Sequence, residues 1–558
     1  MPGAREGARH MLGTRKWTLL GRIMFLLPLA LCVCGFYASG RGILDSLYLG
    51  VQAYMLQLGV DDNPNAAVEV GRWLAPIATS VLGISALAAV VQGRLWSWIC
   101  VRVFKRPAVY GDADLIERYC GPGAEGDGLL PRYVAPGNDH IVKADEYVLM
   151  FHDDAEALGL YSGELERLVR GNAGARVYIG LTGLNAQSVG ADVVVHTFRI
   201  EDYVARRLFT SEAWVRRCSG LVKGREGHDL RVALIGSGGC IEATLEAALE
   251  LNLYDVRQHV TYYAFGLGEK YQMLHEDVIG GDRLRGDRVE PVGGDWRSAW
   301  SREVVSACDA VILCGSHADN VANAADLIRA CPFAAPGDGG PVPIIVLGVG
   351  VDTADLLRRE VDNVAGALER KGKSPTRVVD LAAFGVPGSA GFTLDEIIAD
   401  AEEGYALADE HHGGGRARGT LGKDGPFKYW STVLREYYAG VVWAMVRDRL
   451  CGPTGEGAPV FDRKACDDFA RLEHERWCRY HYLSNWRPCE TADERNDALH
   501  THNCLRSWED LESDKVRAYD YKPLFFALLD NGLDPDAYID KGVCDYVDRE
   551  ILHYRSRG

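Results

Sequence analysis

The stretch RVALIGSGGCIEATLEAAL, residues 231–249, decides the fold of the central part of the chain. An apolar run starting at Arg231 ends in a glycine turn, and a helical pattern follows the turn directly. Small residues in such a turn let the backbone amides at the start of a helix approach a pyrophosphate. The stretch therefore predicts a strand–turn–helix unit with a candidate nucleotide site. The residues of the turn are Gly236, Ser237, Gly238 and Gly239.

Two departures from the dinucleotide pattern G-x-G-x-x-G leave a second interpretation open. Ile241 stands where the third glycine of the pattern would be. The next apolar run, residues 259–265, ends at Gly266 without the acidic residue that binds a ribose hydroxyl in such sites. The turn is therefore either a site for NAD or another nucleotide, or only a tight turn between a strand and a helix.

Further apolar runs alternate with helical patterns on both sides of this stretch. Such alternation is typical of an α/β fold with a parallel, doubly wound sheet. The segments 145–155 and 309–319 resemble each other, because both are apolar runs that end in a polar turn containing a histidine. We predict tandem Rossmann-like parallel-sheet units at 107–224 and 225–398. The other predicted strands are 107–111, 146–151, 176–180, 309–315 and 342–348.

Length, charge and cysteine content narrow the class of protein. The chain has 558 residues, and at roughly 150 residues per domain it should hold three or four domains. Binding to nucleic acid needs clustered Lys and Arg, so the net charge of −17 argues against a nucleic-acid partner. The 15 cysteines form no CxxC pair. They predict reduced thiols in a cytosolic compartment rather than a disulfide framework.

Two apolar segments near the N-terminus predict membrane-spanning helices. Residues 73–93 carry no charge, and about 20 apolar residues match the thickness of a bilayer core. Residues 17–37 are also long enough, although they contain Arg22 and Pro28; a signal peptide is the alternative here. The flanking positive charges predict a multi-pass protein of the cell (inner) membrane, with region 1–106 in the lipid bilayer and both termini cytoplasmic. These charges are Arg5, Arg9, Arg15, Lys16, Arg94, Arg102, Lys105 and Arg106.

The stretch between the two segments allows a pore. Leu44, Leu47 and Val51 recur at helical spacing, so a short helix could dip into the membrane, as in simple cation channels. Asp61 and Asp62 follow where a selectivity filter would lie. The pair either attracts cations or merely solvates a loop. Because two helices cannot enclose a pore alone, a pore would require a homo-oligomer.

This arrangement resembles bacterial proteins that carry potassium-transport NAD-binding (TrkA-N/RCK) domains. The resemblance rests on two membrane helices, a short helix between them and tandem Rossmann-like units. In that family a glycine turn holds a nucleotide that biases a membrane pore. The resemblance implies nucleotide binding at Gly236, Gly238 and Gly239, whereas the first unit keeps only a remnant of the turn at Gly111.

The segment 399–452 predicts a helical connector. Trp430, Leu434, Tyr437 and Val441 recur at intervals of three and four residues, as on one face of a helix. A glycine-rich basic stretch, 412–423, interrupts this pattern. The stretch lacks the first glycine and the final Ser or Thr of a Walker A phosphate loop, so we expect a flexible loop.

The C-terminal motifs are similar to the ryanodine-receptor (RyR) domain. They are FARLEHERW (469–477), NW (485–486), THNCLRSWEDL (501–511) and YD (519–520), and they define a small, mainly α domain at 460–540. In bacterial proteins this domain looks like a ligand-sensing module, so the resemblance implies recognition of a nucleotide-like small molecule. The candidate ligand-binding residues are Glu473, His474, Trp477, Trp486, His502 and Trp508.

Two other interpretations of these residues stay open. Glu473, His474 and Trp477 share a helix face, and the tryptophans could form aromatic walls around a flat ligand. The tryptophans could equally well only build a small core. His502 and Cys504 invite a zinc interpretation, but their spacing does not form the usual paired ligands, so we predict no metal.

The leading functional hypothesis is a membrane-anchored ligand sensor or channel-like effector, with cation transport as one version of it. Nucleotide binding in the Rossmann-like and RyR-like domains would regulate the two-helix membrane region. The alternatives are a membrane-tethered Rossmann enzyme and a membrane scaffold without ligand. Against an enzyme, the sequence shows no G-x-S-x-G motif and no paired catalytic carboxylates, so we predict no catalytic residue.

Overall fold

The computed structural model describes most of the chain. The described residues are 26–54, 65–120, 131–138, 141–172, 174–182, 195–280, 283–330, 342–370, 379–411, 421–450 and 460–552. Within these ranges the chain forms two compact units, Met1–Phe104 and Lys105–Gly558. The finer division into five parts stays a prediction.

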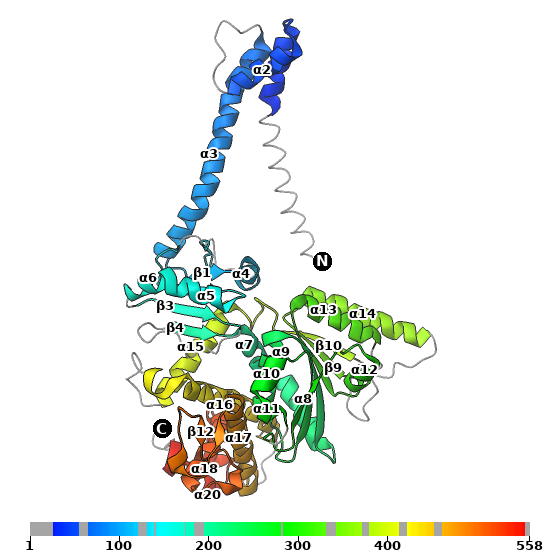
Figure 1. Ribbon diagram of the computed structural model, residues 1–558, viewed down its shortest axis with the longest axis vertical. Helices are drawn as coiled ribbons and strands as arrows, with labels where there is room; N and C mark the ends of the chain where they lie inside the picture. Colours follow the sequence, from blue (N-terminus) through cyan, green and yellow to red (C-terminus); the bar gives the residue numbers. More distant parts are fainter. Residues whose placement is uncertain are drawn as a thin grey trace. The chain divides into compact units, whose positions relative to one another are not determined.

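The N-terminal unit is helical (Figure 1). Residues 26–38 form a helix, followed by α2 (Ile43–Tyr54) and the long α3 (Ala66–Arg102). Asn65 caps α3, because its side chain accepts from the amides of Ala67 and Val68 and donates to the carbonyl of Gly35 at 2.7 Å. A small apolar cluster lies between the helices. Large apolar side chains nevertheless remain exposed on this unit, for example Trp73.

The prediction of two membrane-spanning helices in a multi-pass protein of the cell membrane is wrong. Across the part of the chain that the structure describes, no helix combines the length and the apolar character needed to cross a bilayer. α3 is long enough, but on both sides of the predicted span 73–93 it carries Glu69, Arg72 and Arg102, charged groups that favour water. Positions 17–25 of the first predicted span lie outside the described residues, as do Asp61 and Asp62 of the predicted pore.

The larger unit starts with a parallel four-stranded sheet in the order β1-β2-β3-β4. The three strands predicted here from apolar runs are present, and a fourth follows at the edge. Helices alternate with the strands, as expected for an α/β fold. The strands are β1 (Ala108–Gly111), β2 (Glu146–Met150), β3 (Arg176–Gly180) and β4 (Val195–Phe198). The helices are α4 (Ala113–Cys120), α5 (Asp154–Leu160), η2 (Tyr161–Leu165), α6 (Glu166–Arg170), α7 (Ile200–Thr210) and α8 (Glu212–Gly224).

A parallel six-stranded sheet follows, in the order β10-β9-β8-β5-β6-β7. Numbered from β5, this is the 3-2-1-4-5-6 order of a doubly wound dinucleotide-binding fold. Its strands are β5 (Asp229–Gly236), β6 (His259–Phe265), β7 (Arg288–Val292), β8 (Ala310–Cys314), β9 (Val342–Leu347) and β10 (Val379–Phe384). Its helices are α9 (Gly238–Leu251), α10 (Glu269–Leu274), α11 (Glu276–Ile279), α12 (Ala299–Ser306), α13 (His317–Ala330) and α14 (Val351–Arg370).

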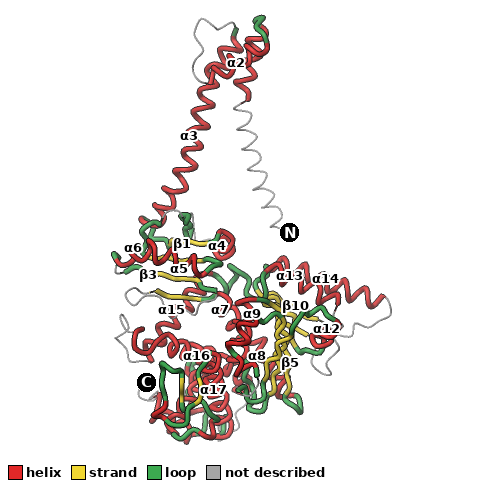
Figure 2. Tube along the Cα trace, in the orientation of Figure 1, coloured by secondary structure: helices red, strands yellow, loops and turns green. Residues whose placement is uncertain are grey.

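Apolar side chains cover both faces of this sheet. Along β5, Val232 and Leu234 belong to one core, whereas Ala233 and Ile235 belong to another, as the alternation of a strand requires. Helices α13 and α14 pack against the second core. They lie together beside β9 and β10 in Figure 2. Burial on both faces explains why the central strands appear in the sequence as continuous apolar runs.

The C-terminal part is mainly helical and shares the first of these cores. Residues from α16 onward, such as Tyr438, Phe461 and Phe525, belong to the same apolar cluster as Val232 and Leu234. Its long helices are α15 (Leu394–His411), α16 (Leu421–Leu450) and α17 (Arg463–Leu483). The shorter elements are β11 (Arg487–Pro488), η3 (Ala492–Glu494), β12 (Thr501–His502), η4 (Trp508–Asp510), α18 (Asp514–Asp520), α19 (Lys522–Leu529), η5 (Pro535–Ala537), α20 (Lys541–Val547) and η6 (Asp548–Leu552).

Candidate functional site

The sheet topology predicts a ligand site at the carboxyl ends of β5 and β8. These neighbouring strands are parallel, and their connections lead away in opposite directions, to β6 through α9 and to β9 through α13. Ligands of open α/β sheets bind outside the carboxyl ends of the strands at such a switch point. The predicted glycine turn, from Gly236 to Gly239, lies at this place.

The glycines of the turn meet two different requirements. A Cβ added at Gly236 would lie 2.2 Å from the carbonyl oxygen of Cys314, so only glycine fits beside β8. Gly238 has a φ of +59°, in the left-handed region, but a Cβ there would meet nothing within 4 Å. Ser237 precedes α9 without a side-chain hydrogen bond to the helix. The turn therefore leaves its surface at Gly238 open and its first amides without a side-chain cap.

The four-stranded sheet contributes a positive charge beside this turn. A Cβ on Gly239 would lie 3.0 Å from the carbonyl oxygen of Thr182 and 3.6 Å from Nη2 of Arg199. Arg199 pairs with Asp202 at 3.2 Å, and this carboxylate is the main cause that raises the pKa of the guanidinium. Arg199 therefore stays charged close to the amino end of α9.

The loop after β8 forms the opposite side of the switch point. The Asn320 side chain accepts from the amide of Gly315 at 2.7 Å and donates to the carbonyl oxygens of Gly315 and Leu347 at 3.0 and 2.9 Å. Asn320 is fully buried. One amide side chain thus fixes the ends of β8 and β9 relative to each other.

The end of β6 lacks the acidic residue of a typical NAD site. Gly266 follows the strand with a φ of +95°, and a Cβ there would lie 2.1 Å from the carbonyl oxygen of Gly236. Leu267 is buried and Gly268 is exposed. β6 itself therefore supplies no carboxylate for a ribose hydroxyl, but Glu242 of α9 reaches this place, with Oε1 3.7 Å from a Cβ added at Gly268.

The residues predicted from the RyR resemblance divide into two groups. Trp477, Trp486 and His502 come together, with ring centroids 5.0 Å apart for Trp477 and His502 and 6.2 Å apart for Trp486 and His502. His474 stacks on Trp477 at 5.8 Å. Trp508 lies elsewhere, between the guanidinium groups of Arg471 and Arg517. The predicted site is therefore an aromatic cluster that does not include Trp508.

Glu473 and His474 are tied into buried polar pairs. The Arg476 guanidinium donates two hydrogen bonds to the Glu473 carboxylate, at 2.7 and 2.9 Å. His474 contacts the carbonyl oxygen of Arg506 at 2.9 Å and forms an ion pair with Asp520 at 3.3 Å. Burial alone would lower the pKa of His474, but Cys478 and Asp520 raise it. The Glu473–Arg476 pair lies within α17, whereas His474 ties α17 to Arg506 and Asp520.

Trp486 already has a ring on each face. Phe427 stacks on it at 4.9 Å and 19°, and His500 stacks on it at 5.2 Å and 5°. Trp486 is buried and His500 is exposed. A flat ligand can therefore reach Trp486 only by taking the place of His500.

The sequence patterns did not reveal several residues of these sites. Arg199 belongs to no motif, because its place beside the glycine turn arises from the packing of α7 on α9. Phe427 comes from α16 and is far in the sequence from the RyR-like motifs. A visible signal was missed on α9, where Glu242, Glu246 and Glu250 recur every four residues on an otherwise apolar helix. Across the described residues, no group of His, Cys, Asp or Glu side chains is placed to hold a metal ion.

Comparisons with known proteins add little to this picture. No protein-family model matches the chain, and no curated protein matches it. Among solved structures, a shikimate 5-dehydrogenase from Mycobacterium fortuitum is 15% identical, over 53% of this chain and 91% of that chain, with a TM-score of 0.26. This similarity is too low to carry an argument. The Rossmann-like assignment rests on the strand order, and the TrkA-N/RCK and RyR resemblances stay predictions.

Proposed function

We propose that the unit Lys105–Gly558 binds a dinucleotide of the NAD type at Gly236, Ser237, Gly238 and Gly239. One observation carries the proposal. The glycine turn lies at the switch point of a six-stranded parallel sheet whose strand order is that of dinucleotide-binding folds.

The proposed binding uses the backbone and one arginine. The uncapped amides of the first turn of α9 would donate to the pyrophosphate, and the helix dipole favours negative charge there. Arg199 would supply the positive charge beside Gly239. β6 ends at Gly266 without the acidic residue of an NAD site, so a 2′-phosphate meets no carboxylate from that strand, but Glu242 of α9 lies close to Gly268. We therefore expect both NAD(H) and NADP(H) to bind.

We further propose that this binding is sensed by the C-terminal part of the unit. α9 carries the glycine turn at one end, and its other end contacts α17 through Arg479. The Arg479 guanidinium donates to the carbonyl oxygen of Leu249 at 3.1 Å and to Asp287 at 2.9 Å. A second, nucleotide-like ligand would stack on Trp486 in place of His500. This sensor proposal concerns one unit and includes no membrane component.

Titration calorimetry on the full chain tests the proposal, with NAD, NADH, NADP, NADPH and ATP as ligands. Gly238→Asp places a carboxylate where the pyrophosphate would lie and should abolish binding. Gly532→Asp is the matched control, because Gly532 also has a positive φ, of +71°, and nothing within 4 Å of an added Cβ. This control should bind normally.

The other outcomes decide between the alternatives. Turnover of a bound nicotinamide nucleotide would favour the Rossmann enzyme. Equal losses in both glycine variants would mean that backbone strain, rather than the site, explains the effect. The absence of binding by every ligand would contradict the proposal and favour the scaffold.

A further inference from the structure

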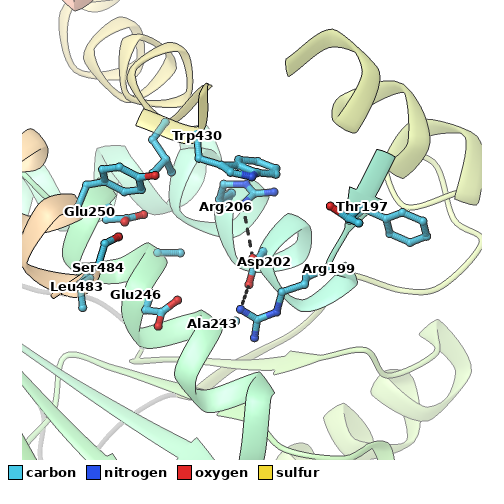
Figure 3. Close-up of a pocket in the computed structure, with 14 residues that line it drawn as sticks. Thr197, Arg199, Asp202, Arg206, Ala243, Glu246, Glu250, Trp430, Leu483 and Ser484 are labelled. Atoms are coloured by element: carbon cyan, nitrogen blue, oxygen red, sulfur yellow. Dashed lines mark ion pairs between the residues drawn. The ribbon is translucent and has the colours of Figure 1, made fainter. Parts of the chain in front are cut away.

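A small polar cavity lies where several parts of the larger unit meet (Figure 3). The carboxyl end of β4, α7, α9, α16 and the end of α17 all contribute side chains to its wall. The cavity has a volume of about 100 Å³. Small-molecule sites usually occupy at least about 300 Å³. The cavity is thus too small for a nucleotide, and it lies farther along α9 than the glycine turn.

Donor groups without partners outnumber acceptor groups in this wall. Within the described residues, Oγ1 of Thr197 and the Nε groups of Arg199 and Arg206 are buried and have no hydrogen-bond partner. The corresponding acceptor is one carboxylate oxygen, Oδ1 of Asp202. Thr197 is 1% exposed and the Arg206 side chain 9% exposed, so bulk water does not reach these groups freely. Buried polar groups normally have partners, and here an acceptor-rich group would supply them.

The arginines are held in place and stay charged. Arg206 pairs with Asp202 at 3.9 Å and with Asp400 at 3.8 Å, and its guanidinium lies 5.1 Å from the ring centre of Trp430. Figure 3 shows Arg206 beneath Trp430, with Asp202 bridging Arg206 and Arg199. This arrangement fixes two guanidinium groups before any ligand arrives, which lowers the entropy cost of binding.

Two acidic side chains of α9 face the same cavity. Burial raises the pKa of Glu246 to about 7 and that of Glu250 to about 8. Near neutral pH Glu250 is therefore mostly protonated and Glu246 partly protonated, so Asp202 and Asp400 supply the full negative charges that face the two arginines. The titratable and charged groups around the two carboxyls are Arg199, Asp202, Arg206, Glu242, Tyr271, Arg476 and Tyr480.

We propose that this junction cavity binds a small oxyanion, the size of a phosphate or carboxylate group, through Thr197, Arg199 and Arg206. The excess of donor groups selects an anion over a cation, and the volume selects a small one. Glu246 and Glu250 accompany the anion as protonated carboxyls that donate hydrogen bonds. The proposal goes beyond nucleotide binding at the glycine turn, with which it shares Arg199, and it predicts a ligand that joins both sheets to α16 and α17. Thr197 and Glu250 line the cavity and not the turn, so variants of these two residues separate the two sites.

Proton uptake follows from this arrangement. An anion placed beside Glu246 and Glu250 raises their pKa further, so binding draws protons onto these groups. Affinity should therefore rise as the pH falls, by about tenfold between about pH 9 and about pH 6. Sulfate is the appropriate probe for this dependence, because its charge stays constant over the range.

The experiment titrates the full chain with sulfate, orthophosphate and formate by calorimetry, against chloride at equal ionic strength. Thr197→Val removes one donor without changing the shape, and we expect sulfate binding about tenfold weaker. Thr491→Val is the matched control, since Thr491 is exposed and caps its helical turn without a side-chain hydrogen bond. Phosphate binding without formate binding would assign a phosphate group, and the reverse would assign a carboxylate.

Glu250→Gln tests the role of protonation. This variant should not destabilise the fold, because glutamine is neutral like the protonated carboxyl. Glutamine imitates the protonated carboxyl, whereas Glu246 stays ionised at about pH 9, so there this variant should bind sulfate about threefold more tightly than the native chain and match it at about pH 6. Glu290→Gln, on an exposed strand position, should change nothing. A calorimetric signal that does not saturate with sulfate and is equal in all variants would be the general effect of a salting-out anion. This result would overturn the proposal. Weaker sulfate binding by Glu250→Gln would overturn it as well.

Discussion

At the scale of single residues, the two glycines of the turn are required for different reasons: Gly236 for lack of space and Gly238 for its backbone conformation. Gly236→Ala places a methyl group 2.2 Å from the carbonyl oxygen of Cys314, so β5 and β8 must move apart. We expect a loss of at least about 3 kcal/mol in the free energy of unfolding. Gly238→Ala meets no atom within 4 Å and carries only the strain of a positive φ, worth about 1–2 kcal/mol. Chemical denaturation of both variants measures the difference, and equal losses would contradict this distinction.

Arg479 is the residue on which the attachment of α17 depends. Its guanidinium is fully buried and donates to Glu475, Asp287 and the carbonyl oxygen of Leu284. Arg479→Met removes the guanidinium shared by two buried carboxylates, and breaking such a buried pair costs about 3–5 kcal/mol. Glu475 then keeps its contact with Arg285, at 3.6 Å, and Asp287 its hydrogen bonds from Gln258 and the amide of Val260. Arg288→Met is the control, because the Arg288 side chain is 63% exposed and its ion pair with Glu290 is long, at 4.0 Å. A loss no larger than that of the control in urea denaturation would refute the role of Arg479.

Sequence motifs predicted individual site residues better than they predicted which residues contact one another. The glycine turn could be found because its chemistry is local, as strand, turn and helix follow one another in the sequence. Arg199 could not be found, since it approaches Gly239 only after α7 packs on α9. The RyR-like motifs predicted that Trp477, Trp486 and His502 share a site, but they also included Trp508, which packs between two arginines instead.

At the scale of elements, α9 has a pH-dependent stability. Burial raises the pKa of Glu246 and Glu250 from about 4.5 in the unfolded chain to about 7 and about 8. The folded state therefore holds more protons than the unfolded state in this range, and stability falls as the pH rises from about 5 to about 8. The double variant Glu246→Gln, Glu250→Gln should lose this slope and gain stability over the native chain as the pH rises. Thermal unfolding at several pH values measures the slope, and parallel curves would contradict the assignment.

Strand prediction succeeded in the centres of the sheets and at the edge strand β1, and it failed at the other three edges. β4, β7 and β10 had no predicted counterpart, and each is an edge strand. Central strands of parallel sheets are buried on both faces and give continuous apolar runs. Edge strands carry polar residues or proline, as β7 does with Pro291, so the same pattern is weaker there. The prediction that α3 spans a membrane failed for a different reason, because apolar composition alone does not distinguish a membrane span from another long helix.

At the scale of the whole molecule, the six-stranded sheet and the C-terminal part should unfold together. One apolar core contains residues of β5, α16 and α17, and Arg479 adds a buried ion-pair network between them. We expect thermal unfolding followed by far-UV circular dichroism and by tryptophan fluorescence to show the same midpoint. Two separated transitions would mean that the C-terminal part folds as an independent domain.

The central claim is that a dinucleotide binds where β5 meets α9. Hydrogen–deuterium exchange of the full chain, with and without NADP(H) and NAD(H), tests it most directly, because binding should protect the amides that donate to the pyrophosphate. The account predicts slower exchange at Ser237, Gly238, Gly239 and the first turn of α9. Unchanged exchange there in the presence of saturating nucleotide, or protection confined to another part of the chain, would contradict it.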